Sequence, residues 1–155
     1  MPSLLFLLPV LALQSQQLTA SELSLGVASS LARQTFIGGE IGLARRTSTQ
    51  SRIALAVAAG SAADQPAARG ELTLQLLTNP AARAGLAPYV GFGAAFSARS
   101  GSPSQGFVAV LIGLEGAPGR PHDWYAELGL SGGVRVAAGW RLRWFPEWWQ
   151  ARGGG

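Results

Sequence analysis

Residues 132–144, GGVRVAAGWRLRW, alternate between apolar and polar or small side chains almost without interruption. The apolar parity consists of Val134, Val136, Ala138, Trp140, Leu142 and Trp144. The opposite parity carries Arg135, Arg141 and Arg143 among alanine and glycine. Because successive side chains of a strand point to opposite sides, this segment has one wide apolar face and one arginine face. The apolar face must therefore lie either in the core of a soluble sheet or against lipid on a membrane barrel.

The same period of two recurs along the chain, in segments separated by clusters of glycine, proline, serine and asparagine that are typical of turns. Most of the segments are long enough to cross a bilayer as a tilted strand, which takes roughly 9–11 residues. The sequence predicts eight strands, at 21–31, 35–46, 51–60, 70–78, 87–99, 106–116, 123–131 and 133–145.

Two all-β architectures fit this pattern. A soluble lipocalin-like barrel would turn its apolar face inward around a ligand, and its outside would then be a face of glycine, alanine and arginine. Such an outside lacks the charge that protects soluble sheets from aggregation, and only 13% of the residues are charged, against about 25% in an ordinary soluble protein. We therefore predict an eight-stranded antiparallel up-and-down transmembrane β-barrel, in which small inward residues leave room for a few long charged side chains.

Charged residues fall on the predicted inward face with both signs. Buried charges are costly unless they are paired, so these residues should form a salt-bridge network inside the barrel. Glu127 is expected near Arg135 or Arg141 of the following strand. The network is expected to fill and stiffen the lumen rather than to conduct ions. Its predicted members are Glu40, Arg52, Glu71, Glu115, Glu127, Arg135, Arg141 and Arg143.

Aromatic residues gather near one end of the predicted strands. Tryptophan and tyrosine favour the lipid headgroup region, because their rings combine an apolar body with a polar group. The predicted aromatics of the lipid interface are Trp124, Tyr125, Trp140, Trp144, Phe145, Trp148 and Trp149.

The chain begins with an apolar run, Leu4 to Leu13, which suits the core of a signal peptide although no basic residue precedes it. Ala12 and Ala20 are possible cleavage points. We assign residues 1–20 to a signal peptide, 21–146 to the barrel and 147–155 to a short C-terminal tail. The absence of cysteine suits an exported protein and excludes disulfides and thiol chemistry.

From about residue 87 the sequence resembles the small outer-membrane β-barrels of Gram-negative bacteria, a group that includes the membrane domain of outer-membrane protein A. The resemblance is carried by PYVGFGAAFS, GFVAVLIGLEG, WYAELGLSGG and VRVAAGWRLRW. It implies both termini in the periplasm, three periplasmic turns and four outer loops, centred on SLARQ, SAADQPAAR, RSGSPSQ and SGG. Members usually end on an aromatic residue that the assembly machinery recognises, whereas here ten residues follow Phe145.

Catalytic motifs are weak. GLSGG around Ser131 matches a nucleophile-elbow string, but no helix follows it and the single histidine, His122, precedes it. Because the chain has no cysteine and only one histidine, we expect no metal cluster, and we predict no cofactor. The net charge of +4 is spread along the chain, which does not suit nucleic-acid binding.

We therefore expect a non-enzymatic protein of the cell outer membrane with a structural or envelope-maintenance role. Its expected partners are outer-membrane lipid and, during biogenesis, the barrel-assembly machinery. The alternatives are a small-ligand or lipid-binding barrel, soluble or membrane-bound, and a lipid-modifying barrel enzyme.

Overall fold

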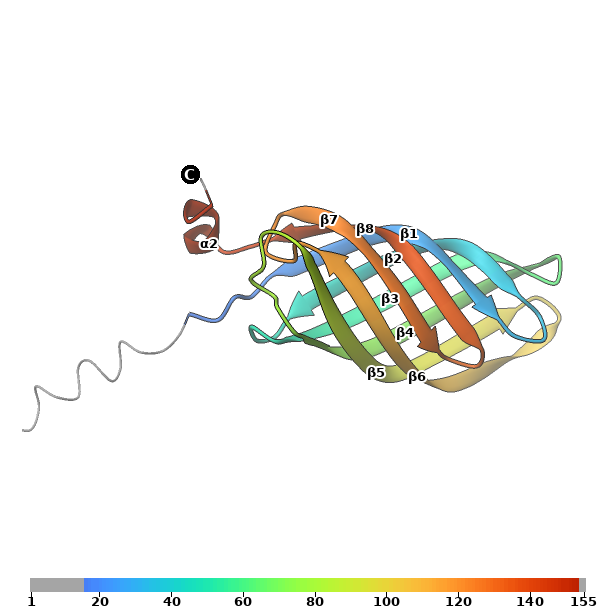
Figure 1. The fold of residues 1–155 in the computed structure, drawn as a ribbon. Helices are drawn as coiled ribbons and strands as arrows, with labels where there is room; N and C mark the ends of the chain where they lie inside the picture. The colour runs from blue at the N-terminus through green and yellow to red at the C-terminus, as the bar shows by residue number, and fades with distance from the viewer. Residues whose placement is uncertain (1–15, 154–155) are drawn as a thin grey trace, which may run out of the picture.

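The computed structural model describes residues 16–153 and consists of one closed antiparallel barrel (Figure 1). Each strand pairs with its neighbours in sequence, and β1 also pairs with β8 along its whole length, which closes the barrel. This topology confirms the predicted fold class. The strands are β1 (Ser21–Leu31), β2 (Phe36–Arg46), β3 (Ser51–Ala62), β4 (Gln65–Leu77), β5 (Leu86–Arg99), β6 (Ser102–Gly116), β7 (His122–Leu130) and β8 (Val134–Trp144), and a short helix α2 (Glu147–Ala151) follows.

The barrel has two different ends. At the terminal end lie residues 16–20, the tail and the turns 47–50, 78–85 and 117–121. At the opposite end, here called the hairpin end, lie the connections 32–35, 63–64, 100–101 and 131–133. Among the described residues, no helix is long and apolar enough to cross a membrane.

Two hairpins extend further than the sequence predicted. β3 and β4 continue until only Ala63 and Asp64 remain between them, and both adopt positive φ angles, 49° and 60°. Two consecutive residues with positive φ make a turn whose twist matches the strands, so pairing continues to the tip. The predicted loops SAADQPAAR and RSGSPSQ are therefore wrong in extent, since most of their residues belong to strands. The tall β5–β6 hairpin passes beyond β7, which pairs with β6 only from Val110 onward.

The outside of the barrel is apolar. Large side chains stand exposed on every strand, and Val108 and Trp140 are 77% and 61% exposed. A soluble lipocalin-like barrel would bury these residues in its interior, so that alternative is wrong for this fold. The exposed set also includes Val27, Ile41, Leu55, Leu74, Phe92, Val110, Ile112, Leu128 and Val136.

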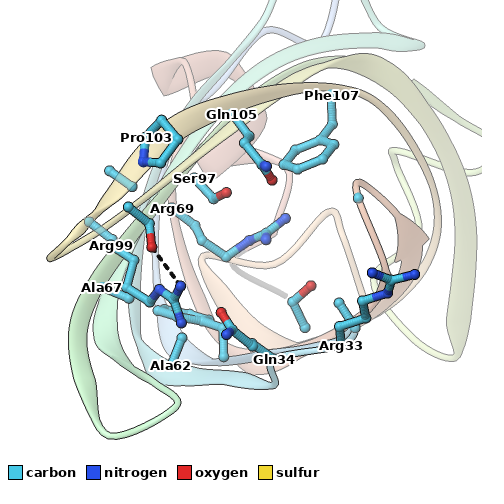
Figure 2. A pocket seen from close by; sticks show the side chains of 17 residues that line it. Arg33, Gln34, Ala62, Ala67, Arg69, Ser97, Arg99, Pro103, Gln105 and Phe107 are labelled. Atoms are coloured by element: carbon cyan, nitrogen blue, oxygen red, sulfur yellow. Dashed lines mark hydrogen bonds between the residues drawn. The ribbon is translucent and has the colours of Figure 1, made fainter.

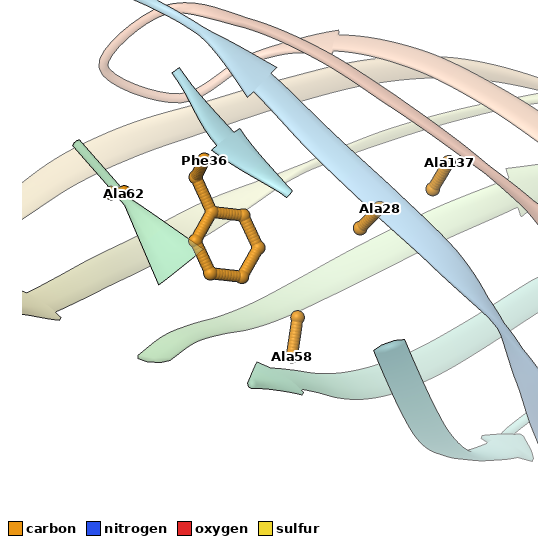
Figure 3. Close-up of a cluster of buried hydrophobic side chains, with 5 residues drawn as sticks. All are labelled: Ala28, Phe36, Ala58, Ala62 and Ala137. Carbon is orange, nitrogen blue, oxygen red and sulfur yellow. The ribbon is translucent and has the colours of Figure 1, made fainter. Parts of the chain in front are cut away.

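The inside combines small residues with long polar ones. Phe36 lies against buried alanines near the hairpin end, and Figure 3 shows its ring pointing among them. The Tyr89 ring covers Gly113, where an added Cβ would lie 2.2 Å from the ring. Glycine and alanine on the inward face thus provide the volume that the large inward side chains occupy. The alanines around Phe36 are Ala28, Ala58, Ala62 and Ala137.

The segments that flank the barrel meet at the terminal end. The predicted signal peptide falls largely on residues 1–15, which lie outside the described residues. Of its remainder, Leu18 is buried against Phe145, with Trp148 and Trp149 beside it. The backbone N–H of Leu18 also donates to Thr49 Oγ1 at 3.1 Å. Cleavage after Ala20 would remove this packing, whereas cleavage after Ala12 would keep it.

Candidate functional site

The lumen near the terminal end holds a dense charge cluster around two buried glutamates. Glu115 Oε2 accepts from Arg141 at 2.6 Å, from Arg143 at 2.8 Å and from Arg52 at 3.2 Å. Glu22 accepts from Arg46 at 2.7 Å and from Arg52 at 2.8 Å. These side chains are at most 5% exposed. We call this group the terminal cluster, and its members are Glu22, Arg46, Arg52, Glu115, Arg141 and Arg143.

The terminal cluster contains more guanidinium groups than carboxylates, and backbone carbonyls of the turns supply the remaining acceptors. Arg46 donates to the carbonyls of Pro80 at 2.9 Å and Pro118 at 2.8 Å. Arg143 donates to the carbonyl of Arg120 at 3.3 Å. Because the carbonyls come from two turns that fold over the barrel end, these hydrogen bonds also close the lumen at the terminal end.

A second cluster, here called the Arg135 cluster, lies nearer the hairpin end. Arg135 donates to Glu40 at 2.6 Å and to Glu127 at 2.8 Å, and its Nε lies 3.8 Å from Glu71. One guanidinium therefore holds three carboxylates that come from three different strands. The side chains of this cluster are 5–10% exposed, slightly more than those of the terminal cluster.

Tyr89 connects the two clusters. Its hydroxyl donates to Glu127 at 2.6 Å, and the guanidinium of Arg52 lies 4.8 Å from the centre of its ring. Arg141 stacks on the ring of Tyr125, at 4.6 Å from its centre, and lies 3.5 Å from Glu127. Cation–π contacts of this kind stabilise guanidinium groups where water is excluded. The lumen thus contains one continuous polar network.

All the charged residues that the sequence singled out lie in this network, but the sequence reasoning missed Glu22, Arg46 and Tyr89. Each has inward parity on its strand, so the alternation could have found it. The three were overlooked because of their positions in the sequence. Glu22 is close to the assigned cleavage point, Arg46 is next to a turn, and Tyr89 lies among apolar residues at the start of a predicted strand. With the additions, the described residues that are buried in the lumen include five glutamates and five arginines.

The predicted interfacial aromatics separate into two groups. Trp140 and Trp144 are exposed on the outside, and Trp124 is partly buried at the start of β7. The interfacial prediction is wrong for Tyr125, which is 2% exposed and points into the lumen because it shares the parity of Glu127. It is also wrong for Phe145, which is buried under Leu18 and under the guanidinium of Arg46.

The described part of the tail, residues 147–153, lies on the turns of the terminal end. Trp149 Nε1 donates to the carbonyl of Gly119 at 2.9 Å, and Arg83 donates to the carbonyl of Trp149 at 2.8 Å. Arg83 also stacks on the Trp149 ring. Trp148 and Trp149 are half-buried in this arrangement.

Small cavities lie within the lumen formed by the described strands. Two cavities of about 10 and 20 Å³ lie beside the Arg135 cluster, and each is about large enough for a single water molecule. The polar network therefore fills the barrel between these cavities and the closed terminal end.

A larger cavity, here called the cup, opens at the hairpin end and has a volume of about 490 Å³. Figure 2 shows Arg33, Arg69 and Arg99 around it, with Phe107 and Gln105 on the β6 side. Phe36 contributes to its floor and also borders the small cavity beside the Arg135 cluster. The cup is thus an open vestibule above the charge clusters of the lumen.

The residues weighed as catalytic are far apart in the fold. Ser131 lies in the β7–β8 connection at the hairpin end, where it is 1% exposed and its Oγ accepts from Arg69 at 3.1 Å. His122 begins β7 at the terminal end and is exposed. The two cannot act on the same bond. Within residues 16–153, no group of histidine, cysteine, aspartate or glutamate residues is arranged to hold a metal ion.

Comparison with known proteins identifies the fold. No protein-family model matches the chain, and a comparison with curated protein sequences finds no match. Among solved structures, the chain is similar to the N-terminal β-barrel domain of Pseudomonas aeruginosa OprF, with 18% identity, coverage of 83% of this chain and 98% of that one, and a TM-score of 0.62. It is also similar to the Yersinia pestis outer membrane protein Ail, with 14% identity, coverage of 81% and 99%, and a TM-score of 0.54.

The chain therefore has the fold of the eight-stranded outer-membrane β-barrels. A closed barrel with an apolar outside and a charged inside is a membrane-spanning barrel, because the closed sheet satisfies its own backbone and only apolar side chains meet hydrocarbon.

Proposed function

We propose that this protein is an integral protein of the outer membrane with a structural, envelope-maintaining role and no catalytic activity. The observation that carries the proposal is the filled lumen. Five buried arginines are tied to glutamates of different strands, and turn carbonyls close the terminal end. A barrel filled in this way is a rigid membrane anchor rather than a pore.

The proposal includes an orientation and a set of partners. The terminal end faces the periplasm and the hairpin end faces outward, as in the barrels that the sequence resembles. Outer-membrane lipid surrounds the apolar belt, and the barrel-assembly machinery inserts the chain. The aromatic pair Trp144 and Phe145 ends the last strand and can provide the internal recognition signal.

Two measurements test the proposal. The purified barrel, reconstituted in planar bilayers, is expected to give no steady conductance, because buried ion pairs occupy the lumen and turn carbonyls close its terminal end. Deletion of the gene is expected to make the outer membrane more permeable to detergents and large antibiotics, and the wild-type gene should restore the barrier. Stable channels, or an unchanged barrier after deletion, would contradict the structural role.

A ligand-binding barrel is the second candidate, and the cup of about 490 Å³ favours it. This volume falls in the range of roughly 300–1,000 Å³ that is typical of small-molecule sites. A lipid-modifying activity has less support, because Ser131 and His122 lie at opposite ends of the barrel. Ser131→Ala and His122→Ala are both expected to leave the acylation of membrane lipid unchanged, which mass spectrometry of extracted lipid would check.

A further inference from the structure

We infer that the cup at the hairpin end binds an anion that carries a phosphate or sulfate group on a body of about sugar size. The inference goes beyond the structural role and rests on the second candidate function, because it names the chemical class of ligand that the cup would hold. It rests on the charge of the cup, on the free hydrogen-bonding capacity of its arginines, and on one buried hydroxyl.

The charge of the cup has one sign. Three arginines line it, Arg33, Arg69 and Arg99, and no aspartate or glutamate is among the lining residues. In the part of the chain that the structure describes, none of the three forms a salt bridge, whereas Arg46, Arg52, Arg135, Arg141 and Arg143 all do. The carboxylates beneath the Phe36 floor, Glu40 and Glu71, lie 2.6 and 3.8 Å from Arg135, although Glu71 also borders the small cavity that Arg69 lines. The cup therefore presents positive charge to a ligand.

The guanidinium groups keep donors free for a ligand. Arg69 donates through Nη2 to the carbonyl and hydroxyl of Ser131, at 2.6 and 3.1 Å. Arg99 donates through Nη2 to Ser102 at 2.6 Å, the bond drawn as a dashed line in Figure 2. These bonds hold two guanidinium groups in place through one nitrogen each. Pre-positioned guanidinium forks bind phosphate and sulfate oxygens strongly.

Ser30 provides an independent observation. It is 2% exposed, it lines both the cup and the small cavity below, and its hydroxyl has no hydrogen-bond partner among the described residues. A buried hydroxyl without a partner is costly. A ligand oxygen or a ligand-bound water in the cup would satisfy it.

The size and polarity of the cup fit a sugar-sized ligand. Its volume exceeds that of a bare phosphate ion, and serine and glutamine side chains on its wall can bond to hydroxyl groups. These polar side chains are Ser97, Gln34, Ser102 and Gln105. The Phe107 ring offers an apolar surface on the β6 side.

The test compares matched probes by isothermal titration calorimetry on the full barrel in a non-ionic detergent at low salt. Glucose 6-phosphate and glucose 6-sulfate are expected to bind, glucose is not, and added salt should weaken binding. The double variant Arg33→Gln, Arg99→Gln should weaken binding about tenfold or more. Arg45→Gln removes one positive charge from an outward position near the terminal end and serves as the control, with no expected effect. A heat-dependent gel shift verifies that each variant is folded.

Equal binding of glucose and its phosphate, equal weakening by Arg45→Gln, or no binding of either anionic probe would overturn the inference. A second arm identifies the source of the phosphate. In phosphatidylcholine nanodiscs, added phosphatidic acid will compete with glucose 6-phosphate if a lipid headgroup reaches the cup. Without competition, the ligand is a soluble anion. In both cases the competition or binding should depend on Arg33 and Arg99.

Discussion

The two ends of the barrel use arginine in opposite ways. In the terminal cluster, the arginines lie on strands whose inward neighbours include Glu22 and Glu115, so each guanidinium has a carboxylate within 4 Å. At the hairpin end, Arg33, Arg69 and Arg99 line an open cup that has no carboxylate in its wall. The comparison indicates that buried arginines crosslink strands, whereas those of the cup remain available to a ligand.

The largest effect is expected from Glu115→Gln. The substitution keeps the shape of the side chain but removes the charge shared by Arg52, Arg141 and Arg143, which stay buried. Breaking a buried ion pair on one side costs roughly 3–5 kcal/mol, and urea unfolding in lipid vesicles would measure the loss. Glu147→Gln, on the exposed side of α2, is the control and should change stability by less than about 0.5 kcal/mol. If both variants lost a similar free energy of unfolding, the claim that the buried charges stabilise the barrel more than exposed ones would be contradicted.

Arg135→Gln is expected to have the next largest effect, about 2–4 kcal/mol, because it leaves three carboxylates without their common partner. The loss should be smaller than for Glu115→Gln. The Arg135 cluster is 5–10% exposed and lies under the cup, so water can reach the stranded carboxylates. The same unfolding measurement ranks the two variants. A larger loss of unfolding free energy for Arg135→Gln than for Glu115→Gln would contradict the claim that the greater exposure of the Arg135 cluster softens the effect.

A packing substitution tests the lumen without touching a charge. In Gly113→Ala the added methyl group would clash with the Tyr89 ring, and the guanidinium of Arg52 stacks on that same ring. Overpacking of this kind costs about 1–3 kcal/mol. Gly39→Ala is the matched control, since an added Cβ there meets nothing within 4 Å. If both variants unfold at the same urea concentration, the Tyr89 ring is not packed closely on Gly113.

The smallest effect is expected at the cup. Arg99→Ala removes one hydrogen bond to Ser102 and no salt bridge of the described chain, so stability should change by less than about 0.5 kcal/mol. Unfolding in vesicles would check this. A loss above about 1.5 kcal/mol would mean that Arg99 is a structural arginine like those of the terminal cluster.

Much of the fold could be predicted from the sequence, because one face of each strand is predominantly apolar. The predicted strand at 51–60 and its neighbour at 70–78 were nevertheless too short, since Pro66 and Asp64 resemble loop residues. A two-residue turn with positive φ at Ala63 and Asp64 lets the strands continue to the tip. Such a turn is favoured by asparagine or glycine, neither of which is present here.

The charged lumen was predictable in composition and, between paired strands, in partnership, since Glu127 lies 2.8 Å from Arg135 and 3.5 Å from Arg141 as expected. Partnerships between strands that do not pair were not predictable. Parity identifies Glu115 and Arg52 as inward residues, yet they come from strands β6 and β3, which do not pair with each other. Their contact depends on how the strands tilt and stagger when the barrel closes, which a period of two does not determine. The same applies to the hydrogen bonds from Arg46 to the carbonyls of Pro80 and Pro118, because they require turns that fold over the barrel end.

The orientation of the two faces is tested most directly by fluorescent labels on single cysteines, which are clean probes because the chain has none. Val110→Cys places the label on the apolar outside, and Gln105→Cys places it in the cup. In lipid vesicles, brominated acyl chains should quench the label at residue 110 and leave the label at 105 bright, whereas aqueous iodide should do the reverse. If iodide quenched the label at 110 and brominated lipid did not, the apolar face would not meet the membrane, and the description of the protein as a lipid-embedded barrel would be contradicted.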